Sequence, residues 1–222
     1  MITPELQILL STAISIGVIH TLTGPDHYVP FVVMAKSKGW TLKKTSSVTL
    51  MCGLGHVSSS IIIGIIGIIF GVGLSKIEFL ESQRGDIAGW LFIIIGALYL
   101  IFGITKRITH QKPHTHKLPK FLTRKNSDRK ISPWSLFLIF VFGPCEVLVP
   151  MLMYPAAHEN STAILLVSVT FSIATLLTML AVVLPLSFLT VKIPFKNIHK
   201  YSNVLVGITL LTCGISIIFL GL

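Results

Sequence analysis

Six apolar segments separated by polar stretches run through this chain of 222 residues. They cover residues 6–24 (with a continuation through 25–35), 46–75, 87–105, 134–154, 162–190 and 202–220. Each is close to or longer than the roughly 20 residues that a helix needs to cross a bilayer. A composition with 52% hydrophobic and only 12% charged residues excludes a water-soluble domain. The sequence therefore predicts an all-α membrane protein with six transmembrane helices, in contact with the lipid bilayer.

The basic residues are distributed unevenly among the connections between these segments. Of the 18 Lys and Arg residues, sixteen lie in the alternate connections 36–44, 106–131 and 191–201. Basic loops stay on the cytoplasmic side of a membrane. We therefore expect a multi-pass protein of the cytoplasmic (inner) membrane with both termini outside. The net charge of +10 comes from these loops, so it does not indicate a nucleic-acid partner.

Two sets of matching features indicate an internal repeat. Gly24-Pro25 and Gly143-Pro144 are 119 residues apart, and two runs of glycines spaced by seven are offset by 118: Gly89, Gly96, Gly103 and Gly207, Gly214, Gly221. A spacing of seven places glycines on one helix face, where another helix can approach closely. We expect two inverted three-helix repeats, residues 1–105 and 132–222, with helices broken by Gly-Pro near the midplane and joined by the loop 106–131.

The stretch from His20 to His27 places two histidines and Asp26 inside an apolar segment. Ionisable groups in a membrane mark functional sites by default. A continuous helix would separate His20 and His27 by about 10 Å along its axis, too far for two ligands of one ion at about 2.0–2.2 Å. A break at Gly24-Pro25, with Pro30 in the following segment, would bring them together. The alternative is a simple proline kink whose polar residues face a loop.

Further candidate ligands lie at similar depth in other segments. His56 follows Gly53 and Gly55, and the second Gly-Pro break, Gly143-Pro144, is followed by Cys145 and Glu146, with Pro150 closing the stretch. Imidazole, carboxylate and thiolate together suit nickel, cobalt, zinc or iron better than magnesium or calcium. We therefore predict a midplane site for a divalent transition metal, which is carried as substrate. Its predicted ligands are His20, Asp26, His27, His56, Cys145 and Glu146.

Two weaker patterns accompany this site. Hydroxyl side chains face it and are predicted to line a path, although they are equally suited to joining helices: Ser59, Ser60, Ser168, Ser172 and Thr175. The loop 106–131 carries His110, His114 and His116, which can collect metal at the cytoplasmic mouth. Its other interpretation is a flexible basic connector.

The motifs His20…Asp26-His27 and Leu54-Gly55-His56-Val57-Ser58 resemble signatures of nickel/cobalt transporters. The six-segment size and the Gly-Pro-Cys-Glu…Pro stretch are similar to the shorter NicO-like and UreH-like members of the LysE superfamily. The sequence differs from the transporter signature in having five residues between His20 and Asp26. The resemblance implies a nickel or cobalt transporter, not an enzyme, that works by alternating access, and it leaves room for a homo-oligomer.

Two other functions stay open from the sequence. The same superfamily includes membrane thiol–disulfide electron conduits, which need a membrane cysteine in both repeats; here the position paired with Cys145 is Asp26. A urease-type accessory protein or scaffold that docks through the loop 106–131 is the other alternative. Cys52 and Cys213 are the remaining cysteines, far apart in the sequence and in apolar segments, so they predict no disulfide framework.

Overall fold

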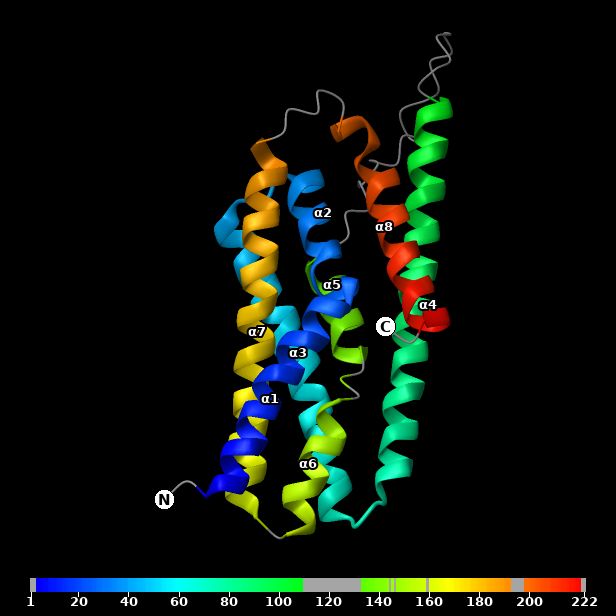
Figure 1. Cartoon of the computed structure of the whole chain (residues 1–222). Helices are drawn as coiled ribbons and strands as arrows, with labels where there is room; N and C mark the ends of the chain where they lie inside the picture. Colours follow the sequence, from blue (N-terminus) through cyan, green and yellow to red (C-terminus); the bar gives the residue numbers. More distant parts are fainter. Residues whose placement is uncertain are drawn as a thin grey trace.

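The computed structural model of the chain is built of helices, and Figure 1 shows them running alongside one another in a bundle. It describes residues 3–109, 133–143, 145, 147–158, 160–192 and 198–220. The helices are α1 (Pro4–Thr23), the 3-10 turn η1 (Pro25–His27), α2 (Val29–Lys38), α3 (Leu42–Ile69), α4 (Leu74–Thr109), α5 (Pro133–Phe142), α6 (Leu148–Ala157), α7 (Ser161–Lys192) and α8 (Ile198–Leu220).

Four of the described helices are long and apolar enough to cross a membrane, namely α1, α3, α4 and α7. Many of their large apolar side chains point outward, where lipid replaces water as the solvent. These observations confirm the predicted all-α membrane protein. The predicted lipid contact follows directly from the same outward-facing side chains.

Both predicted Gly-Pro interruptions are present. Helix α1 ends at Thr23, and the N–H of Gly24 donates to the carbonyl of His20 before the chain turns through η1. The next α-helix begins at Val29, four residues later than a helix started by Pro25 would begin. In the second half, α5 ends at Phe142 and α6 begins at Leu148. The second prolines, Pro30 and Pro150, lie in the first turns of α2 and α6, where a missing N–H removes no helix bond.

The start of α4 differs from the expected polar connection at residues 76–86. The helix already begins at Leu74, so this stretch is helical and its charges lie along the helix. Ile77 and Glu81 are almost completely buried where the helix meets the bundle, while Glu78 is exposed. The physical reason is that Glu81 pairs with Arg84 one turn later, which makes a charged segment compatible with a packed helix.

The glycines spaced by seven bring α4 and α8 into backbone contact, as their spacing predicts. A Cβ atom built on Gly207 would lie 2.6 Å from the backbone N of Leu100 and 2.9 Å from the carbonyl of Gly96. A Cβ on Gly96 would likewise meet the backbone N of Leu211 at 2.7 Å. Such distances are shorter than real contacts, so only glycine lets these helices approach this closely. Gly221 lies outside the described residues.

Two apolar clusters flank the middle of the bundle. One contains Cys52 and Cys213 with residues of α2, α3, α4, α5, α7 and α8, and the other contains Cys145 with residues of α1, α3, α6 and α7. None of the three cysteines is in a disulfide. Gly24 at the first break and Cys145 at the second are both buried, so the two breaks are enclosed by packed side chains.

Gly207→Ala should destabilise the protein, because the added methyl group must push apart two helix backbones. Overpacking of this kind costs about 1–3 kcal/mol. We expect a lower unfolding temperature for the detergent-solubilised protein, measured by intrinsic fluorescence. Gly73→Ala is the matched control, since a Cβ there meets nothing within 4 Å. Equal unfolding temperatures for both variants would show that the α4–α8 contact is looser than described.

Candidate functional site

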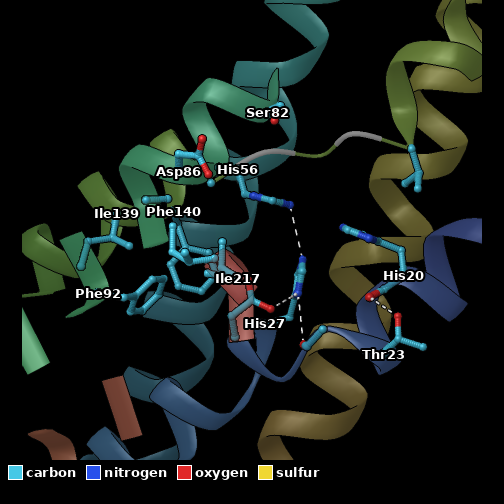
Figure 2. Close-up of a pocket in the computed structure, with 17 residues that line it drawn as sticks. His20, Thr23, His27, His56, Ser82, Asp86, Phe92, Ile139, Phe140 and Ile217 are labelled. Carbon is cyan, nitrogen blue, oxygen red and sulfur yellow. Dashed lines mark hydrogen bonds and ion pairs between the residues drawn. The ribbon is translucent and has the colours of Figure 1, made fainter. Parts of the chain in front are cut away.

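Three histidines from two distant parts of the chain meet at the first break. His20 comes from the last turn of α1, His27 from the turn η1 and His56 from the middle of α3. One nitrogen from each ring lies within 4.8 Å of the others. His27 and His56 are each only 2% exposed. Figure 2 shows the ring of His27 between those of His20 and His56.

The spacing of these nitrogens fits ligands of a single metal ion. The Nε2 atoms of His27 and His56 are 3.4 Å apart. Two imidazole nitrogens bound to one tetrahedral ion at about 2.0–2.1 Å would be separated by about 3.4 Å. The ring centroids of His20 and His27 are 4.8 Å apart. The break at Gly24 therefore brings His20 and His27 to one place, as their spacing predicts.

Asp26 orients His27 instead of facing the other rings. Its Oδ1 lies 3.1 Å from Nδ1 of His27, and the carbonyl of Gly24 lies 3.2 Å from the same nitrogen. Both neighbours are acceptors, so Nδ1 carries the proton and Nε2 presents its lone pair toward His56. Carboxylates commonly hold metal-binding histidines in this way. Asp26, predicted as a ligand, thus contacts Nδ1 of His27 and not the Nε2 atom that faces His56.

The two break glycines abut the histidine rings. A Cβ on Gly24 would lie 2.5 Å from Nδ1 of His27, and a Cβ on Gly143 would lie 3.2 Å from Nδ1 of His56. A larger residue at Gly24 would displace His27 from its present position. Glycine at the first break therefore both ends α1 and leaves room for a ligand side chain.

Cys145 reaches the triad from the second break. Its Sγ lies 3.9 Å from Nε2 of His20, and its side chain is fully buried. A thiolate and an imidazole on one tetrahedral ion would be about 3.5 Å apart, so a small shift would let Cys145 join the three histidines. Glu146 and Pro144 lie outside the described residues, as do His110, His114 and His116.

A cavity of about 320 Å³ adjoins the triad. Its lining includes His20, Asp26, His27 and His56 together with Ser82 and Asp86 of α4, and Figure 2 draws the lining residues. Ser82 and Asp86 are exposed. The triad is therefore reachable through a space whose rim carries a carboxylate.

Four of the five hydroxyl residues predicted to line a path donate hydrogen bonds to other groups of the protein. Ser59 donates to the carbonyl of His56, and Ser60 donates to Glu81. On α7, Ser168 and Ser172 bond to carbonyls one turn earlier in their own helix. Thr175 is buried, and its Oγ1 has no hydrogen bond to the described part of the chain.

Glu81 and Arg84 are the site-related residues that sequence reasoning missed. Arg84 Nη1 lies 2.5 Å from Glu81 Oε1, and the two side chains contact Ser59, Ser60 and the second break. Their spacing of three residues, which puts opposite charges on one helix face, was a readable signal. Neighbouring Lys76, Glu78 and Asp86 concealed it by making the segment resemble a loop.

Comparison with known families corrects the identification suggested by the motifs. Residues 29–219 match the family model of the cytochrome c biogenesis protein transmembrane region. The resemblance to nickel/cobalt transporters was therefore wrong, and so was the nickel or cobalt transport that it implied. The matched range begins after His20–His27, the stretch on which that resemblance chiefly rested, and includes His56 and Cys145.

Searches of curated proteins and of solved structures found no match. The family model, however, extends over most of the chain, from the start of α2 to near the end of α8. It also agrees with the apolar helices described above. The chain belongs to the family of the cytochrome c biogenesis protein transmembrane region.

Proposed function

We propose that this protein conducts electrons through the membrane in a cytochrome c biogenesis pathway, using a metal ion held by His20, His27 and His56. The observation that carries the proposal is the convergence of three imidazole nitrogens within 4.8 Å. The family match supports the pathway, and the side-chain geometry supports the carrier. The proposal thus follows the electron-conduit alternative, with a metal ion in place of a cysteine pair.

A metal carrier suits the histidine site better than a pair of thiols that includes Cys145. A dithiol relay forms and breaks a disulfide, whereas Cys145 lies in a different apolar cluster from Cys52 and Cys213. Zinc has no redox chemistry. Copper and iron both change oxidation state and accept imidazole, and copper is also favoured by a nearby thiolate. We therefore propose copper or iron at the triad.

The electron balance of the proposed cycle is simple. An ion held by His20, His27 and His56 would supply one-electron chemistry between a dithiol protein, the donor on one side of the membrane, and a protein disulfide, the acceptor on the other side. Two cycles convert one disulfide into two thiols with uptake of two protons. The same two cycles convert the donor dithiol into a disulfide with release of two protons.

We infer that the membrane frame is the predicted pair of inverted three-helix repeats. The packing supports this inference. Helices α1 and α2 pack on α7, just as α5 and α6 pack on α3. In addition, α3 packs on α7, and α4 packs on α8. Exchange of the two halves preserves each of these contacts. On this reading the chain crosses the cytoplasmic membrane six times, with both termini outside.

Direct thiol exchange by Cys145 is a second candidate function. The contact between Cys145 Sγ and His20 Nε2 favours it, because an adjacent imidazole can take up the thiol proton. Here the Cys145 thiolate would attack a disulfide of the acceptor protein, which forms a mixed disulfide and frees one acceptor thiol. A thiol of the donor protein would then attack the Cys145 sulfur and free the second acceptor thiol. The other thiol of the donor would finally close the donor disulfide and regenerate Cys145.

His27→Ala and His56→Ala should each lower the bound metal at least tenfold, because two remaining imidazoles hold an ion poorly. The measurement is elemental analysis of protein purified in detergent and exposed to copper, iron and zinc in turn. His158→Ala is the matched control, since His158 is exposed and its ring meets that of Tyr154 at a tilt at the end of α6. Wild-type metal content in both triad variants would reject the site.

Asp26→Asn should weaken metal binding about 10- to 100-fold while leaving the three ligands in place, as expected for loss of a carboxylate behind a histidine. The readout is the dissociation constant obtained by competition with a chelator of known affinity. An unchanged constant would show that Asp26 does not orient His27 in the loaded protein.

Cys145→Ser separates the two candidate functions. Proteoliposomes would hold a protein disulfide inside and a reduced dithiol protein outside, and the thiols formed inside would be measured. A metal carrier predicts that transfer persists, with loss of any sulfur-to-metal absorption. Abolished transfer with unchanged metal content would instead support direct exchange by Cys145.

A further inference from the structure

A buried ion pair lies beside the second break. Glu81 is fully buried, and the side chain of Arg84 is 13% exposed. Charges enclosed by protein within a membrane are costly unless every oxygen and N–H group finds a partner. The pair therefore needs a reason to be retained at this point on α4.

The hydrogen-bond partners of the Glu81–Arg84 pair lie on α3 and at the second break. Glu81 Oε2 accepts from Ser60 Oγ at 3.0 Å and from the backbone N–H of Cys145 at 3.3 Å. Arg84 Nη2 donates to Ser59 Oγ and to the carbonyl of Val141, each at 2.7 Å. Ser59 and Ser60 follow His56 by three and four residues on α3. The pair thus connects the helix that carries His56 to the segment that carries Cys145.

The break itself creates the need for these bonds. The last carbonyls of a helix have no intrahelical donor, and proline at position 144 supplies no N–H. Arg84 provides the donor for Val141 and approaches the carbonyl of Gly143 at 3.4 Å. Glu81 and Ser60 provide the acceptors for the N–H of Cys145. At the first break, by contrast, neighbouring residues supply the hydrogen bonds. The N–H of Gly24 donates to the carbonyl of His20, and His27 bonds to the carbonyl of Gly24.

We propose that Glu81 and Arg84 are positioning residues that hold Cys145 Sγ next to His20 and so set the fourth ligand of the metal site. The part concerning the metal rests on the proposed function, whereas the part concerning the thiol does not. Neither residue touches the triad. Both act through the backbone of the second break.

The test measures the reactivity of Cys145 in metal-free protein. In a Cys52→Ala, Cys213→Ala background, Cys145 is the one remaining thiol, and its rate of labelling by a small maleimide reports its enclosure. We expect Glu81→Gln to raise this rate at least fivefold, because the neutral amide leaves Arg84 unpaired and loosens the break. Glu78→Gln, exposed on the same helix, is the control.

Ser60→Ala guards against misfolding of the charged variants. It removes one acceptor of the Cys145 N–H without leaving a charge unpaired, and a smaller rise of at least twofold is expected. In copper-loaded protein, Glu81→Gln should also weaken sulfur-to-copper absorption while three-histidine binding persists. Labelling rates of Glu81→Gln and Ser60→Ala within the range of Glu78→Gln would overturn the proposal. If Glu81→Gln and Ser60→Ala raise the labelling rate but the protein binds no metal, the metal carrier is rejected and the positioning of Cys145 by Glu81 and Arg84 stands.

Discussion

A helix that ends inside a membrane leaves backbone groups without water to bond them, and this constraint governs the structure around the site. The chain meets it twice, after α1 and after α5. At the first break, Gly24 donates to His20 and its carbonyl receives a bond from His27. At the second, Arg84 and Glu81 of another helix supply the missing donor and acceptor. The groups that satisfy the backbone therefore also fix the residues of the site.

This coupling explains why so few side chains suffice to build a buried polar centre. Asp26 and Gly24 determine which nitrogen of His27 is protonated, and so which one faces His56. The close α4–α8 contact, made possible by glycine, anchors the helix that carries Glu81 and Arg84. The first half of the chain contributes one break and the three histidines, and the second half contributes one break and Cys145. The redox chemistry proposed for the centre then needs only an ion with two oxidation states.

Much of this arrangement was readable in the sequence. Apolar segments and Gly-Pro pairs predicted the helices and their interruptions, because proline chemistry and membrane thickness are local constraints. The requirement that His20 and His27 approach one ion predicted the break at Gly24, and the depth of His56 predicted its meeting with them. Seven-residue glycine spacing predicted a close helix contact, and the structure identifies α8 as the partner of α4.

Other features depend on contacts that no local pattern encodes. Glu81 and Arg84 were placed in a connection because charged neighbours surround them, and their burial is decided by Ser60 and the second break on other helices. Asp26 was predicted as a ligand, and the structure adds that it contacts Nδ1 of His27, a pairing that the sequence does not reveal. The family was misidentified because about a dozen motif residues carried that resemblance, whereas residues 29–219 as a whole match the cytochrome c biogenesis family.

X-ray absorption spectroscopy of copper-loaded protein in detergent tests the central claim most directly, because it reports the ligands around the ion itself. The account predicts three imidazole nitrogens at about 2.0 Å, with one sulfur at about 2.3 Å when Cys145 is bound. Loss of imidazole scattering in His56→Ala would link the signal to the triad. A shell of oxygen atoms without imidazole in the wild-type protein would contradict the account.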